Sequence, residues 1–118
     1  MGTLGELERA VMDAIWDADG ALSAYDVQSQ LETDGRALAV TTLLTVLSRL
    51  EKKGFVSSDR SARPHRYTAV ASRTDHVAEL MHSVLGDAGD RAAVLKRFVG
   101  GVSPEDAAVL RQLLGRSG

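Results

Sequence analysis

The sequence of 118 residues has no cysteine. This absence excludes a disulfide framework, a thiolate metal cluster and a cysteine nucleophile. No apolar run approaches the roughly 20 residues that cross a bilayer, and the first ten residues, MGTLGELERA, lack the basic and then apolar pattern of a secretory signal. A glycine-rich phosphate loop is missing, and so are the known catalytic constellations. We therefore expect a cytoplasmic protein that does not enter a membrane, is not an enzyme and needs no cofactor.

The charge is distributed unevenly along the chain. The formal net charge of −2, taken alone, argues weakly against a nucleic-acid partner. Residues 1–35 carry a net charge of −7, residues 36–73 carry +6, and residues 74–118 carry −1. In the second segment, which we call the central basic block, eight basic side chains outnumber two acidic ones. The block is either an unevenly charged solvated surface or a surface for an anionic partner, and its place among the helices decides between them.

Apolar spacing and helix-start signals predict a mainly α fold with one small β-hairpin. Thr3 and Glu6 fit a capping box at the start of the first helix, and Ser23 can cap the second. Gly54 is placed to end the third. The predicted helices cover about residues 4–18, 23–33, 40–53, 72–85, 92–99 and 103–114, and two short antiparallel strands, at 55–56 and 66–70, flank a basic loop.

The helix predicted over residues 40–53 has an unusual polar face. On a helical wheel its apolar residues fall within one arc, formed by Val40, Leu43, Leu47 and Leu50. The opposite side carries three threonines, although β-branched residues are unfavourable in helices and a solvated face is ordinarily built of Glu, Lys, Gln and Ala. Threonine offers a hydroxyl for base edges and a methyl for the thymine methyl, and arginine or lysine can reach guanine or phosphate. The exposed ridge consists of Thr42, Thr45, Arg49 and Lys52, with Thr41 and Ser48 beside it.

The order of the predicted elements is that of a winged helix-turn-helix domain. Two helices precede the helix over residues 40–53, and a basic hairpin follows it. In helix-turn-helix proteins the corresponding helix enters the major groove of DNA, and a basic hairpin beside it can lie along the backbone. The hairpin residues expected at phosphates are Arg60, Arg63, His65 and Arg66. The alternative is a winged-helix module for protein–protein interaction, because fold does not fix function. DNA binding is distinguished from it by a steep loss of affinity with salt.

Residues 73–118 form the second predicted domain, after a winged-helix domain over residues 1–72. Its helices carry apolar stripes that so short a segment cannot bury alone, because domains under roughly 70 residues rarely sustain a core. We therefore expect a helical dimerisation domain and a homodimer, with folding back onto the first domain as the alternative. The residues expected at the dimer interface are Val77, Leu80, Met81, Val84, Leu85, Val94, Leu95, Phe98, Val99, Leu110, Leu113 and Leu114.

The chain has three histidines, His65, His76 and His82. The last two are six residues apart and so lie on different faces of one helix, whereas zinc sites ordinarily show closer ligand pairs. Surface histidines are the expected interpretation and no metal is expected, although a dimer could assemble a site from both chains.

Several stretches resemble the penicillinase-repressor family, which comprises the BlaI/MecI group and copper-responsive relatives. The opening LGELE at residues 4–8, followed by VM at 11–12 and IW at 15–16, resembles the start of these proteins. The run VTTLLTVLSRLEKKG over residues 40–54 is similar to their recognition helix, and RY at 66–67 resembles their wing. The C-terminal FV at 98–99 with SPE at 103–105 matches their pattern as well.

The resemblance implies a homodimeric winged-helix repressor whose N-terminal domain binds an inverted-repeat operator in double-stranded DNA and controls β-lactam or cell-envelope response genes. The residues for which it implies major-groove contacts are Thr41, Thr42, Thr45 and Arg49. Those for which it implies backbone contacts are Lys52, Lys53, Arg60, Arg63, His65 and Arg66.

The resemblance also implies how the repressor is released. The β-lactam-responsive members are cut through a membrane-bound sensor metalloprotease pathway before a phenylalanine, and the matching bond here is Arg97–Phe98. Those members have asparagine before the phenylalanine, so Arg97 departs from the pattern. The copper-responsive relatives carry a cysteine pair near the C-terminus, and the absence of cysteine here excludes that sensing chemistry.

Overall fold

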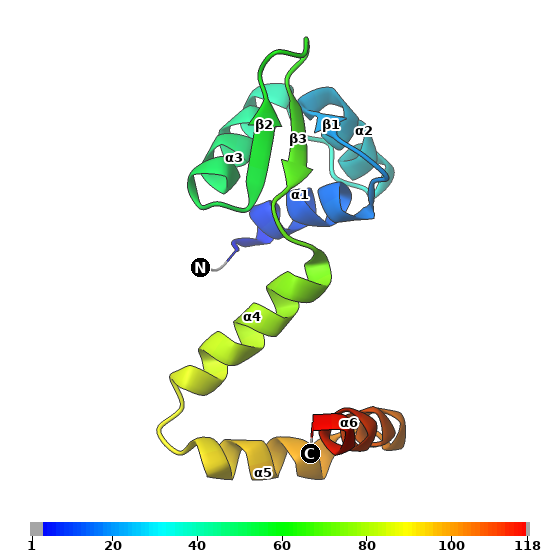
Figure 1. The fold of residues 1–118 in the computed structure, drawn as a ribbon. Helices are drawn as coiled ribbons and strands as arrows, with labels where there is room; N and C mark the ends of the chain where they lie inside the picture. Colours follow the sequence, from blue (N-terminus) through cyan, green and yellow to red (C-terminus); the bar gives the residue numbers. More distant parts are fainter. Residues whose placement is uncertain (1–3, 118) are drawn as a thin grey trace. The chain divides into compact units, whose positions relative to one another are not determined.

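The computed structural model describes residues 4–117 (Figure 1). Their contacts divide the chain into two compact units between Ala78 and Glu79. We call residues 4–78 the winged unit and residues 79–117 the helical unit. The elements are α1 (Glu6–Asp17), β1 (Leu22–Ser23), α2 (Ala24–Thr33), α3 (Val40–Lys52), β2 (Val56–Asp59), β3 (Arg66–Ala69), α4 (Arg73–Gly86), α5 (Arg91–Gly101) and α6 (Pro104–Ser117).

Local signals in the sequence set the ends of these helices. Ser23 caps α2 as predicted, because its hydroxyl accepts from the N–H of Asp26 at 3.1 Å and the Asp26 carboxylate accepts from the N–H of Ser23 at 2.9 Å. Gly54 follows α3 with φ of 85°, a left-handed conformation that favours glycine, so the predicted end of this helix is confirmed. The predicted cap at Thr3 lies outside the described residues, and α1 begins after Gly5.

The core of the winged unit lies between α1, α2 and α3, with the sheet closing one side (Figure 1). The apolar arc predicted for α3 is confirmed at three positions, since Leu43, Leu47 and Leu50 are fully buried. Val40 is half-buried, and Val46 joins the core instead. Burial of these side chains is the main stabilising contribution to the unit, at about 1.5–3 kcal/mol for each large one.

The sheet has three antiparallel strands in the order β1-β3-β2, one more than predicted. The strand β1 has two residues, Leu22 and Ser23, which pair with Tyr67 and Arg66 of β3. Two residues carry no alternation pattern, so this strand depends on the long-range pairing and has no local signal. Asp59 of β2 lies opposite Arg66, and the loop between β2 and β3 forms the wing.

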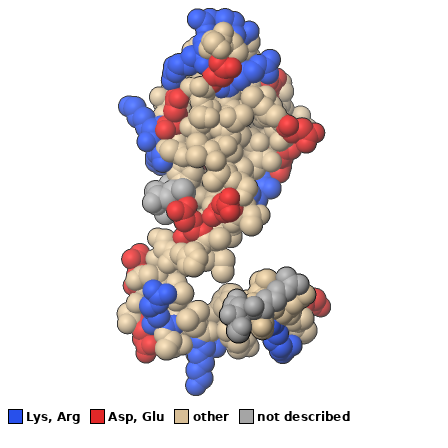
Figure 2. All heavy atoms as spheres, viewed as in Figure 1, with Lys and Arg blue, Asp and Glu red and all other residues tan. Residues whose placement is uncertain are grey.

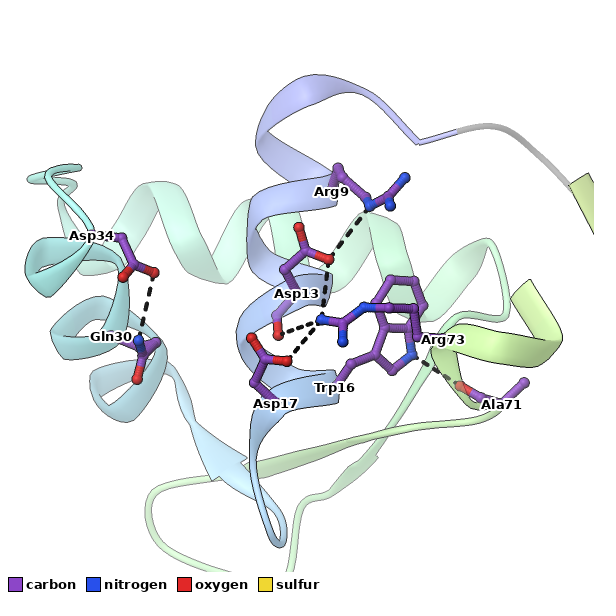
Figure 3. A network of polar contacts seen from close by, with 8 residues as sticks. All are labelled: Arg9, Asp13, Trp16, Asp17, Gln30, Asp34, Ala71 and Arg73. Atoms are coloured by element: carbon purple, nitrogen blue, oxygen red, sulfur yellow. Dashed lines mark hydrogen bonds and ion pairs between the residues drawn. The ribbon is translucent and has the colours of Figure 1, made fainter. Parts of the chain in front are cut away.

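The first turns of α4 belong to the winged unit. Arg73 donates to Asp17 at 2.9 Å and to Asp13 at 3.4 Å, and its guanidinium carbon lies 5.4 Å from the ring centroid of Trp16 (Figure 3). The indole N–H of Trp16 donates to the carbonyl of Ala71 at 3.0 Å. The predicted domain boundary after residue 72 falls at the start of α4, whereas the contacts divide the chain further along this helix.

The helical unit exposes most of its large apolar side chains. Ser103 caps α6 and Pro104 is its first residue, as predicted, with the N–H of Asp106 donating to the Ser103 hydroxyl at 3.1 Å. No residue of α5 is buried. The exposed apolar residues of this unit are Met81, Val84, Val94, Leu95, Phe98, Val99, Val109, Leu113 and Leu114. Between residues 4 and 117, no helix combines the length and hydropathy needed to cross a membrane.

Candidate nucleic-acid interface

The solvent face of α3 carries the residues that the sequence predicted there. Thr41, Thr42, Thr45 and Arg49 are all exposed, and so are Ser48 and Lys52. The hydroxyl of Thr45 donates to the carbonyl of Thr41 at 3.1 Å, which uses its proton and leaves the oxygen free to accept.

Contacts on the two sides of α3 define the middle of this face. Glu51 faces the wing, since its carboxylate accepts from the Ser58 hydroxyl at 2.6 Å and from Arg60 at 2.8 Å. These bonds, that of Ser58 first, hold the pKa of Glu51 below its usual value. The other side faces α1, because Lys53, on the same side as Arg49, lies 2.8 Å from the Glu8 carboxylate of α1; the pKa of Glu8 is lowered by the N–H of Gly5, then by Lys53 and also by Arg49.

Between these two sides, four exposed residues follow one another at helical spacing. We call them the central line of α3, and they are Thr41, Thr45, Ser48 and Lys52. Ser48 was absent from the predicted contacts, although its place on the wheel beside the threonines is a signal for it. A short hydroxyl in the middle of the exposed face suits hydrogen bonding to a base edge.

The wing is held by bonds within its own loop. The Asp59 carboxylate accepts from the hydroxyl of Ser61 at 2.5 Å and from its N–H at 3.0 Å, and these bonds, that of the hydroxyl first, hold the pKa of Asp59 below its usual value. Arg63 donates to the carbonyl of Arg60 at 2.7 Å. Figure 2 shows Lys and Arg side chains gathered at the top of the molecule, over this loop. The loop is therefore an ordered support for positive charge.

Half of the central basic block is neutralised inside the winged unit. The ion pairs are Arg36 with Glu6 at 3.0 Å, Lys53 with Glu8 at 2.8 Å, Arg60 with Glu51 at 2.8 Å, and Arg73 with Asp17 at 2.9 Å. Three of these carboxylates belong to the acidic first segment. Among the described residues, the members of the block that form no ion pair with a carboxylate are Arg49, Lys52, Arg63 and Arg66.

These four unpaired cations are exposed: Arg49 and Lys52 lie on α3, and the other two lie in the wing loop (Arg63) and at the start of β3 (Arg66). The structure therefore divides the six residues predicted to contact the DNA backbone into two groups of three. Lys53 and Arg60 have carboxylate partners, and His65 is half-buried. Lys52, Arg63 and Arg66 are exposed and form no ion pair with a carboxylate of the described residues, so they remain able to pair with an anionic partner.

An apolar hollow of about 230 Å³ lies between α2, the first half of α3 and the wing. Tyr25 of α2 and Leu44 of α3 line it and are 59% and 44% exposed. Sequence reasoning missed both residues, because an apolar residue near the arc of a wheel is ordinarily assigned to the core. The remaining lining residues are Ala24, Val40, Arg63, Pro64, His65 and Tyr67.

The expectation of a surface histidine is wrong for His76. The residue is 2% exposed, because the first turn of α4 packs against Trp16 of α1 and against Phe55, which precedes β2. The ring centroid lies 5.2 Å from that of Trp16 and 5.3 Å from that of Phe55, the latter edge-on. Within residues 4–117 neither ring nitrogen has a hydrogen-bond partner. His82 is exposed, as expected.

The three-helix core, the hairpin wing and a threonine-lined helix between unpaired cations define a winged-helix DNA-binding protein. The comparisons with known proteins agree with this class. The model of the penicillinase repressor family matches residues 4–116, so the chain belongs to this family of DNA-binding transcriptional repressors. The chain is 43% identical over 114 residues to the transcriptional regulator BlaI of two Mycobacterium tuberculosis strains, CDC 1551 and H37Rv, covering 94% of this chain and 82% of that protein.

Two solved structures share the fold. A MarR family protein from Bacillus stearothermophilus aligns with a TM-score of 0.52 and 16% identity, over 98% of this chain and 73% of that one. The complex structure of hsRosR-S4 aligns with a TM-score of 0.55 and 20% identity, over 91% and 92%. At these identities the likeness concerns the fold, and it confirms the predicted winged-helix class.

Proposed function

We propose that this repressor binds an inverted-repeat operator in double-stranded DNA as a homodimer. In each protomer α3 lies in the major groove, with its central line toward the base edges and the wing along the phosphate backbone. The observation that carries the proposal is the placement of four exposed cations that form no ion pair with a carboxylate in the described chain, on the same helix as the exposed threonines and on the hairpin that follows it: Arg49, Lys52, Arg63 and Arg66.

The chemistry of this face assigns a role to each kind of side chain. Thr41, Thr45 and Ser48 offer hydroxyls to base edges, and Thr42 lies beside them. Arg49 is placed to donate two hydrogen bonds to one guanine, which is the commonest specific contact in the major groove. The cations of the wing neutralise phosphates, and so supply affinity and orientation without recognising sequence.

The homodimer is supported by the helical unit. Its exposed apolar side chains lie on all three helices, and a second copy would bury them. A two-fold dimer doubles the DNA contact, and it places the two copies of α3 at half-sites about one helical turn apart or a multiple of it. The predicted interface therefore also explains the inverted repeat.

Release from the operator by proteolysis is a separate proposal. The Arg97–Phe98 bond lies within α5, and the Phe98 side chain is half exposed. Because a helical peptide bond must unwind to enter a protease, the membrane-bound sensor metalloprotease pathway would act on a locally opened α5. Mass spectrometry of the chain from β-lactam-treated host cells tests this, with a fragment ending at Arg97 as the expected result. A chain that stays intact while its target genes are induced would rule it out.

Selection of DNA fragments tests the proposed function. Sheared DNA of the host genome is incubated with the full chain at about 150 mM salt, and the retained fragments are sequenced. The expected result is a shared inverted repeat, bound with an affinity that falls steeply as salt rises. Retention without any common sequence would contradict operator recognition. No salt-dependent retention at all would favour the alternative of a protein-interaction module.

A further inference from the structure

The apolar hollow beside α3 contains two exposed side chains that core packing does not explain. Leu44 leaves 44% of its surface exposed and Tyr25 leaves 59%, although both are large and apolar. They face the same hollow from different helices. None of the contacts assigned above to base edges or phosphates uses them.

The position of Leu44 follows from its neighbours on the helix. Val40, Leu44 and Glu51 share one side of α3, and Glu51 is bonded to Ser58 of β2 and to Arg60 of the wing. Leu44 therefore lies between the central line and the wing. The hollow is continuous with the proposed DNA interface, because Arg63, an unpaired cation, also lines it.

The lining of the hollow favours one kind of occupant. Its walls are largely carbon, from Ala24, Val40, Leu44, Pro64 and the tyrosine rings. A phosphate against these carbon walls would lose hydration for which the walls themselves offer no compensation, and Arg63 can meet a phosphate outside the hollow as well as inside it. Among the groups that bases present in the major groove, the thymine methyl is the apolar one.

We propose that Leu44, with Tyr25 beside it, takes up a thymine methyl of each operator half-site and so specifies thymine at one position. This inference rests on the proposed function. Burying one methyl corresponds to about a fourfold gain in affinity at each half-site, and about fifteenfold when both halves of the dimer make the contact. Leu44 is then a specificity-determining residue beside the threonines.

The test replaces thymine by deoxyuridine, which lacks the methyl group and keeps the base pair. In the selected operator each thymine is replaced in turn, symmetrically in both half-sites, and binding is measured for the full wild-type chain and for Leu44→Ala. Val70→Ala is the matched control, since Val70 is a 62% exposed apolar residue of the winged unit that does not line the hollow. Tyr25→Phe removes a hydroxyl and keeps the apolar ring.

We expect one thymine position at which deoxyuridine weakens wild-type binding about fifteenfold. At that position Leu44→Ala binds the thymine and deoxyuridine operators equally, whereas Val70→Ala and Tyr25→Phe keep the wild-type difference. Other positions, contacted by threonine methyls, respond to deoxyuridine alike in Leu44→Ala and in the wild type.

Two results would overturn the inference while leaving the proposed function in place. One is Leu44→Ala keeping the full deoxyuridine response at every thymine. The other is Leu44→Ala weakening the operator and random duplex equally, which would make the contact one with the backbone. Failure to select any operator would instead overturn the proposed function, and the inference with it.

Discussion

The division of the central basic block into paired and unpaired cations predicts that two neighbouring wing arginines differ in their effect on salt dependence. Arg63 has no carboxylate partner among the described residues, whereas the Arg60 guanidinium lies 2.8 Å from the Glu51 carboxylate. A cation that neutralises a phosphate releases counterions, and the slope of log K against log salt falls by about 0.9 for each such contact. An arginine already neutralised within the protein releases few counterions.

The magnitudes follow from the number of unpaired cations. If Lys52, Arg63 and Arg66 of each protomer meet phosphates while Arg49 meets a base, the dimer has a slope of about −5, and its affinity falls about 10³-fold between 50 and 200 mM salt. Arg63→Ala flattens this slope by about 1 per protomer, equally on operator and random DNA. Arg60→Ala, the matched control, flattens it by less than half as much.

Fluorescence anisotropy of a labelled operator duplex, titrated at five or more salt concentrations, measures these slopes. Sedimentation of each variant checks that the oligomeric state is unchanged. Equal flattening by the two variants would refute the argument from ion pairing. An unchanged slope for Arg63→Ala would remove the wing from the contacts with DNA.

Three further predictions concern stability and assembly. The pKa of Glu8 is lowered by the N–H of Gly5 and then by Lys53, so its contribution is present above about pH 4.5 and is lost as pH falls through the lowered pKa. Glu8→Gln should reduce the free energy of unfolding by about 1–2 kcal/mol at pH 7 and by much less near pH 3, as urea unfolding will measure; an equal loss at both would contradict the charge argument. His76→Leu should stabilise the chain by about 1–2 kcal/mol at pH 7, because it removes two buried nitrogens without partners, and a destabilised variant would mean that the imidazole has a partner. A chain ending at Ala78 keeps the contacts of the winged unit, so it should fold, sediment as a monomer and bind the operator more weakly; a dimer would contradict the proposed interface.

The sequence predicted best those features that local rules govern. Helical periodicity predicts the buried arc of Leu43, Leu47 and Leu50. Backbone hydrogen bonding and conformation predict the cap at Ser23 and the glycine after α3. The structure confirms all three features. The exposure of Thr45 follows from the same wheel.

The rest depends on contacts between residues far apart in the chain. The strand β1 exists through its pairing with β3, and His76 is buried because Trp16 and Phe55 enclose it. The charge count placed eight cations together, but it could not show that the carboxylates of α1 neutralise Arg36, Lys53 and Arg73. Likewise, a wheel shows Leu44 near the apolar arc, and only the packed wing shows that it borders a hollow.

We propose above that α3 recognises the operator sequence through its central line. The most direct test is the ratio of the affinity for the selected operator to that for a random duplex of equal length, measured for the wild type and for Thr45→Ala. We predict that Thr45→Ala lowers this ratio about tenfold, within the roughly 1–3 kcal/mol that a lost base contact costs, while random-DNA binding is unchanged. An equal loss of affinity on both duplexes would make Thr45 a backbone contact and contradict the claim.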